Sequence, residues 1–295
     1  MMNLDPGQLE ALAAVISEGT FDAAARALHV TPSAVSQRVK ALETSVGQVL
    51  LARSKPVRAT TAGETLLRAA RQIQAVSADV LRELGAQDAG EGSGPPVVAL
   101  AVNADSLDTW FLAALAELGG AVFDLRREDE NRTAELLRRG EVMAAVTTSG
   151  NPVPGCVVRR LGKMRYAPRS AAAFRAQWFP DGLTVAALSR APVVLFDRDD
   201  TIQDRYLRRR ARQPLHPPRH YIPESGPYFQ AVRLGLGWGM IPDLQLARDT
   251  SADLADLDPA GGMDVELYWQ QWRAAGPALE RVARAVQATA AQFLR

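Results

Sequence analysis

Apolar residues recur every three to four positions through the first fifty residues, which is the spacing of short helices around one small core. Asp5 and Pro6 suit the start of a first helix, and Gly19 suits its end. A second run begins at Phe21, and a third follows Thr31, a favourable N-cap with proline after it. The pattern therefore predicts three helices joined by tight turns.

The third predicted helix separates an apolar stripe around Val35, Val39 and Leu42 from a polar face. Two short helices of this kind match a helix-turn-helix, in which the second helix enters the major groove of DNA. Glutamine can pair with adenine, arginine with guanine, and serine or threonine with phosphates. The candidate DNA-binding residues are Thr31, Pro32, Ser33, Ala34, Ser36, Gln37, Arg38, Lys40, Arg53 and Lys55.

Basic residues continue past the third helix, where Arg53, Lys55 and Arg58 flank Pro56 in a predicted hairpin, or wing. Between residues 31 and 60, five basic residues stand against the single acidic Glu43, whereas the whole chain carries a net charge of only +1. A local basic patch is what phosphate binding requires. The alternative is a helical bundle with a solvated basic face.

A long amphipathic helix is predicted from Thr60 to about Leu84. Leu66, Ile73 and Val80 recur every seven residues, which is typical of a helix that pairs with a second helix. The alternative is a helix packed on its own domain. The sequence DAGEGSGPP at 88–96 then predicts a hinge, because glycine and proline interrupt helices.

Strands and helices alternate after the hinge, starting with VVALAV, and this predicts an α/β domain with a largely parallel sheet. The segment ADSLDTWFLAALAEL predicts a helix capped by Asp105 or Ser106. Ligands of open α/β sheets bind beyond the carboxyl ends of the strands. Free amides there favour a carboxylate, whereas Asp105 and Asp108 favour a cation, so the pair of features suits a zwitterion or a cationic amino acid. The alternative is that both aspartates merely cap the helix.

The sequence contains little evidence for a catalytic site. Its three histidines, His29, His216 and His220, belong to no metal-binding or hydrolase motif, and Cys156 is its single cysteine. We therefore expect no enzyme activity, no cofactor, no metal and no disulfide. The amino-terminal segment lacks a basic region before its apolar run, and no apolar stretch approaches the ~20 residues that span a bilayer, so we expect a cytoplasmic protein without a membrane partner.

The first sixty residues resemble the LysR-type transcriptional regulators, with one departure, Leu51, where that family usually has phenylalanine. The residues that carry the resemblance are Phe21, Ala25, Leu28, Ser33, Ala34, Ser36, Lys40, Leu42, Glu43, Gly47, Leu50, Arg53, Thr61, Ala62 and Gly63. It implies a winged helix-turn-helix at 1–60 and a dimerising linker helix at 61–87. It also implies an antiparallel pairing of linker helices in a dimer or a dimer of dimers.

The rest of the chain resembles the ArgP/LysG-like, arginine- or lysine-responsive branch of that family. The resemblance is carried by VNADSLDTW, AVTTSGNPVPGC, LGKMRY, VVLFDRDDTIQ, GLGWGMIPDLQ and LYWQQW. It implies a periplasmic-binding-protein-like effector domain at 97–295, with lobe one at 97–163 and 270–295, lobe two at 168–264, and the effector between them. The matching positions are Asn103, Asp105, Ser106, Leu107, Trp110, Thr147, Thr148, Ser149, Asp197, Asp200, Glu224 and Ser225.

The resemblance implies an activator that senses lysine or arginine, controls genes of amino-acid export or metabolism, and works on promoter DNA with RNA polymerase. Pro168, Arg169 and Glu224 depart from that branch, so a LysR-type regulator with a different effector stays open. A solute-binding protein would fit the cleft, but the missing signal peptide and the helix-turn-helix argue against it, whereas a constitutive DNA-binding protein stays open. The arginine run at 205–212 predicts a solvated helix face, with a second DNA contact as the alternative.

Overall fold

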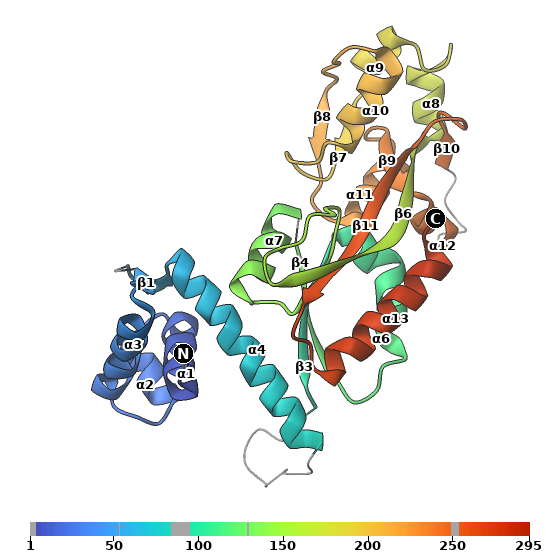
Figure 1. Cartoon of the computed structure of the whole chain (residues 1–295). Coiled ribbons are helices and arrows are strands. Elements are labelled where there is room, and N and C mark those ends of the chain that lie inside the picture. Colours follow the sequence, from blue (N-terminus) through green and yellow to red (C-terminus); the bar gives the residue numbers. More distant parts are fainter. Residues whose placement is uncertain (1–3, 53, 84–94, 129, 249–253) are drawn as a thin grey trace.

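A computed structural model describes residues 4–52, 54–83, 95–128, 130–248 and 254–295. It consists of a small helical head, a long helix and a two-lobed α/β domain (Figure 1). The predicted site residue Arg53 and most of the predicted hinge lie outside the described residues. Among the described residues, no helix combines the length and the apolar character needed to cross a membrane.

The head contains the three predicted helices and a short hairpin. Asp5 caps the first helix by accepting a hydrogen bond from the Gln8 amide at 2.9 Å, and Gly19 ends it with a positive φ of 72°. Thr31 caps the third helix in the same way, with Ala34 as the donor at 3.2 Å. Both predicted helix starts are confirmed. The head elements are α1 (Pro6–Glu18), α2 (Phe21–Ala27), α3 (Pro32–Val46), β1 (Leu51–Ala52) and β2 (Arg58–Ala59).

The long helix α4 (Thr61–Glu83) connects the head to the α/β domain. Its first turns complete the head, where Ala70 is buried in the helical core. Farther along, Ala75 packs against a core cluster of lobe one. Ile73, Val76 and Val80 remain exposed in this single chain. The helix therefore packs on its own chain along one side and keeps an apolar stripe free on another.

Lobe one is built on three parallel strands in the order β5-β3-β4. Two long strands, β6 (Cys156–Ala171) and β11 (Met263–Trp272), pair with each other antiparallel and run from lobe one into lobe two (Figure 1). The other elements of lobe one are β3 (Val97–Val102), α5 (Ala104–Ser106), the π-helical turn η1 (Leu107–Phe111), α6 (Leu112–Ala116), β4 (Val122–Arg127), α7 (Glu130–Arg139), β5 (Ala144–Thr147) and α13 (Pro277–Phe293).

Lobe two surrounds the far ends of the two long strands, where β9 and β10 pair with β6. Trp238 is fully buried there. Gly239 is packed so closely that a Cβ would lie 2.6 Å from the Tyr228 hydroxyl, as expected of a close-packed turn. The elements are α8 (Ala172–Trp178), α9 (Val185–Arg190), β7 (Val193–Leu195), α10 (Ile202–Ala211), β8 (Arg219–Tyr221), α11 (Ser225–Arg233), β9 (Gly239–Pro242), α12 (Asp243–Arg248) and β10 (Leu254–Asp256).

One predicted cap is wrong. The helix after β3 begins at Ala104, with Asn103 in the N-cap position, rather than at Asp105 or Ser106. The chain turns into the helix directly from the strand, because Asn103 is its last extended residue (φ −68°, ψ 152°). This early start leaves the Asp105 carboxylate free of capping, so it is available for contacts across the molecule.

Candidate functional site

The DNA-binding candidates lie on one side of α3. Pro32, Ser33, Ser36, Gln37 and Lys40 are all exposed, and their spacing places them on the helix face opposite the buried stripe. Thr31 and Lys55 are exposed as well, whereas Ala34 and Arg38 are half-buried. The head therefore presents a polar and basic helix face beside the basic hairpin.

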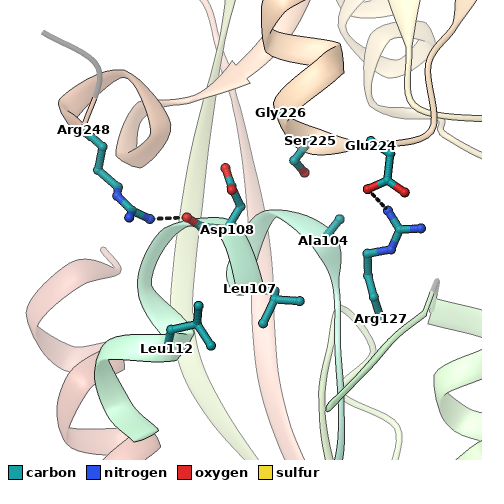
Figure 2. A pocket seen from close by; sticks show the side chains of 9 residues that line it. All are labelled: Ala104, Leu107, Asp108, Leu112, Arg127, Glu224, Ser225, Gly226 and Arg248. Atoms are coloured by element: carbon teal, nitrogen blue, oxygen red, sulfur yellow. Dashed lines mark hydrogen bonds and ion pairs between the residues drawn. The ribbon is translucent and has the colours of Figure 1, made fainter. Parts of the chain in front are cut away.

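A pocket of about 300 Å³ lies between the two lobes (Figure 2). Its lobe-one wall comes from the turn after β3 and from the end of β4, and its lobe-two wall comes from the start of α11 and the end of α12. This is the edge where the parallel strands end, as the rule for open α/β sheets requires. The lining residues are Ala104, Leu107, Asp108, Leu112, Arg127, Glu224, Ser225, Gly226 and Arg248.

Asp105 of lobe one lies directly behind this lining and is hydrogen-bonded both to the long strand β6 and to lobe two. The Tyr166 hydroxyl, on the long strand β6, donates to its Oδ2 at 2.7 Å, and the Ser225 hydroxyl, in lobe two, donates to its Oδ1 at 2.9 Å. Burial raises the pKa of Asp105. Among the described residues, no lysine or arginine forms an ion pair with this carboxylate. The site therefore holds a desolvated acid that has no countercharge in the described part of the chain.

A second carboxylate strengthens the negative character of this region. Asp200 is half-buried, accepts hydrogen bonds from the amides of Phe196 and Ile202 at 3.1 Å each, and has its pKa raised by burial. It also raises the pKa of Asp105 through charge repulsion. Asp197, the predicted neighbour, instead accepts the amides of residues 199 and 200 at 2.8 Å each, which fixes a local turn.

Two arginines bridge the lobes at the pocket (Figure 2). Arg127 at the end of β4 forms an ion pair with Glu224 at 2.6 Å and donates to the Pro223 carbonyl at 3.0 Å. Arg248 reaches in the opposite direction, from lobe two to the carbonyl oxygens of Asp108 and Thr109 in lobe one. The pocket wall thus contains cations as well as carboxylates, which suits a ligand that carries both charges.

The structure brings part of the predicted effector set to the pocket. Leu107, Glu224 and Ser225 line it, and Asp105 lies behind Ser225. The following residues lie elsewhere or point away. Ser106 and Trp110 are fully buried, Asn103 is half-buried with a buried, unpartnered Oδ1, Thr147 and Ser149 contact Gln270 on β11, and Thr148 is half-buried.

Sequence reasoning missed Tyr166, Arg127, Gln245 and Arg248. Gln245 donates to the Asp108 carboxylate at 3.1 Å from lobe two. The signal that could have found Arg127 is its place at the carboxyl end of a parallel strand, β4, because ligands of open α/β sheets bind at that edge. The departing residue Arg169 does not line the pocket, since it forms an ion pair with Asp256 at 2.8 Å within lobe two.

Comparison with known proteins agrees with this architecture. Residues 6–64 match the family model of the bacterial regulatory helix-turn-helix proteins of the lysR family, and residues 98–291 match the LysR substrate binding domain. The lysine export transcriptional regulatory protein LysG of Corynebacterium glutamicum is 42% identical over 99% of this chain and 100% of its own.

Solved structures show the same similarity. The crystal structure of ArgP from Mycobacterium tuberculosis has a TM-score of 0.93, with 44% identity and 99% of both chains covered. The full-length LysG of C. glutamicum with bound effector Arg has a TM-score of 0.84, with 38% identity, 99% of this chain and 100% of that chain covered. The chain therefore belongs to the LysR family of DNA-binding transcriptional regulators and is not an enzyme.

Proposed function

We propose that this regulator senses a basic amino acid, lysine or arginine, in the pocket between its lobes. The observation that carries the proposal is the desolvated Asp105 carboxylate, which lacks a cation among the described residues. A buried charge without a partner is costly, and a ligand that supplies the opposite charge recovers that cost. The ammonium or guanidinium group of a basic side chain supplies it.

The rest of the pocket suits the α-amino and α-carboxylate groups. Asp108 and Glu224 offer carboxylates, and Arg127 offers a guanidinium that still has free donors. The first amides of α11, at Ser225 and Gly226, have no partner within the helix and can hold an anion. With Asp105 ionised, the lining and Asp105 together carry one more negative charge than positive, which complements the single positive charge of lysine or arginine.

Relatives support the same class of ligand. LysG of C. glutamicum is named as a regulator of lysine export, and its full-length structure holds the effector Arg. We extend this to the present chain as an activator of amino-acid export or metabolism genes. Because it acts on promoter DNA, we place it in the cytoplasm with RNA polymerase as a partner.

The head supplies the DNA contacts in this proposal. The polar face of α3 reads bases, with the exposed Gln37 and the half-buried Arg38 as the discriminating pair, and Lys55 binds phosphate. The exposed stripe of Ile73, Val76 and Val80 on α4 pairs with a second copy of the chain. Two heads then read two half-sites, and a dimer of dimers contacts more of the promoter.

Isothermal titration of the full-length protein tests the effector. L-lysine and L-arginine are titrated separately, and L-glutamine serves as the control that keeps the zwitterion without the side-chain charge. We expect saturable binding of at least one basic amino acid and none of glutamine. Equal binding of glutamine would mean that the zwitterion alone is recognised, and binding of none would remove the basic amino acid as the effector.

A further inference from the structure

The end of β4 contacts the pocket on one face of the sheet and, on the other face, the segment that carries the linker helix. Arg126 and Arg127 are consecutive strand residues, so their side chains point to opposite faces of the sheet. Arg127 reaches across the pocket to Glu224 in lobe two. Arg126 reaches the other way, to Glu141 at 2.8 Å, in the segment that follows α7. One short stretch of backbone is thus fixed to two separate parts of the molecule.

The linker helix is fastened to that same segment. Arg68 and Arg71 of α4 donate to the carbonyl oxygens of Arg138 and Arg139 at 3.2 and 3.0 Å, and these carbonyls belong to the last turn of α7. Arg139 returns an ion pair to Glu64 of α4 at 3.1 Å. We call this set of contacts the α4–α7 clasp.

The backbones of the two elements pack closely at the clasp. Gly140, directly after α7, has a φ of 67°, and a Cβ added there would lie 3.0 Å from the Arg68 Cα. Glu141 follows Gly140 and lies within electrostatic reach of Arg71 as well as in contact with Arg126. A shift of β4 relative to α7 therefore changes the surroundings of the linker helix, because Glu141 contacts Arg126 on β4 and directly follows the glycine that packs against Arg68.

We propose that the end of β4 couples the effector pocket to the linker helix, with Arg127 sensing lobe two and Arg126 acting through Glu141 on the α4–α7 clasp. The effector in this scheme rests on the proposed function. The coupling itself does not, since it concerns contacts among the residues of the chain. Arg126 and Glu141 are positioning residues, because neither lines the pocket.

A double-mutant cycle on DNA affinity tests the coupling without any effector. The probe is a duplex selected from a random-sequence library by the full-length wild-type protein. Its Kd is measured for the wild type, Arg127→Ala, Glu141→Gln and the double variant. Allosteric coupling factors are about 5- to 150-fold, so we expect Arg127→Ala to change the Kd by about 5-fold or more in the wild-type background and by less than about 2-fold in the Glu141→Gln background.

Glu266→Gln provides the matched control, because Glu266 is an exposed carboxylate in surface ion pairs with Arg160 and Lys163 on lobe one. In that background Arg127→Ala should keep its full effect. An equal effect of Arg127→Ala in all backgrounds, or no effect in any, would overturn the coupling. Arg126→Gln breaks the same contact from the other side and replaces Glu141→Gln if thermal unfolding shows that variant to be poorly folded.

The ligand provides a second, separate measurement. Coupling is reciprocal, so operator DNA should change the lysine or arginine Kd of the wild type, while in Glu141→Gln that Kd should be the same with and without DNA. If Glu141 had only a structural role, Glu141→Gln would lower the stability of the protein, but DNA would still change the amino-acid Kd of the variant. That result would contradict the proposal. If no amino acid bound but the double-mutant cycle gave the expected result, the proposed effector would be wrong and the coupling would still be supported.

Discussion

Replacing Asp105 by asparagine separates the charge of this residue from its shape. The carboxylate accepts hydrogen bonds from Tyr166 at 2.7 Å and from Ser225 at 2.9 Å. Asparagine keeps one carbonyl acceptor and can donate to the other hydroxyl, so the network between the lobes survives. What the variant loses is the negative charge, which we propose pairs with the basic side chain of the effector.

The expected loss follows from the burial of that pair. Removing one charge from a buried, hydrogen-bonded ion pair costs about 2–5 kcal/mol. Since about 1.4 kcal/mol is tenfold, the Kd for lysine or arginine should rise by about 30- to 4,000-fold. Isothermal titration measures it, with Asp264→Asn as the control, because Asp264 pairs with Arg165 outside the pocket. A Kd within about 3-fold of the wild type would refute the role of Asp105.

The same substitution has an effect on stability with a defined sign. Burial raises the pKa of Asp105, so its contribution to stability is fully present below the unfolded pKa and is lost as the pH rises through the folded pKa. Ionisation of this carboxylate therefore weakens the fold. We expect the melting temperature of Asp105→Asn without ligand to equal or exceed that of the wild type at pH 7, and a clear decrease would show that the charge is already compensated.

Three further predictions concern the pocket, the head and the linker. A bound cation favours ionised Asp105, so affinity for the basic amino acid should fall as the pH is lowered toward the pKa of this carboxyl. Titrations in buffers of different ionisation enthalpy should then show that binding releases protons. Binding that does not depend on pH would contradict this. Gln37→Ala should lower the preference for the selected duplex over random DNA, whereas Lys55→Ala should weaken both and lower the salt slope by about one. Ile73→Glu with Val80→Glu should shift sedimentation toward smaller species, and unchanged assembly would exclude the α4 stripe as the interface.

Much of the fold could be predicted from the sequence, because short local motifs mark where its helices begin. Thr31 before Pro32 defines α3, and the seven-residue spacing of Ile73 and Val80 marks a stripe that is exposed on the single chain. The failure at Asp105 has a physical reason. Both Asn103 and Asp105 suit an N-cap. Which of them takes that position depends on the residue at which β3 ends, and the pairing of the sheet sets this end rather than the local sequence.

The site was harder to predict because its decisive partners are distant in sequence. Tyr166 and Ser225 contact Asp105 from 61 and 120 residues away, and Arg127 and Glu224 are separated by 97 positions. Matching positions to a family places residues near a cleft, but it does not tell which of them face it. Trp110 shows the limit, since it belongs to the predicted set and is nevertheless buried in the core of lobe one.

The two bridging arginines, Arg127 and Arg248, limit how an effector can change the arrangement of the lobes. Arg127 extends from lobe one to lobe two and Arg248 from lobe two to lobe one, so side chains of the protein itself bridge the lobes on both sides of the pocket. An effector that binds here therefore meets contacts that already join the lobes. It must exchange contacts, and an α-carboxylate competes with Glu224 for Arg127. Since a ligand shifts an equilibrium only by its difference in affinity for the two states, this exchange is where that difference arises.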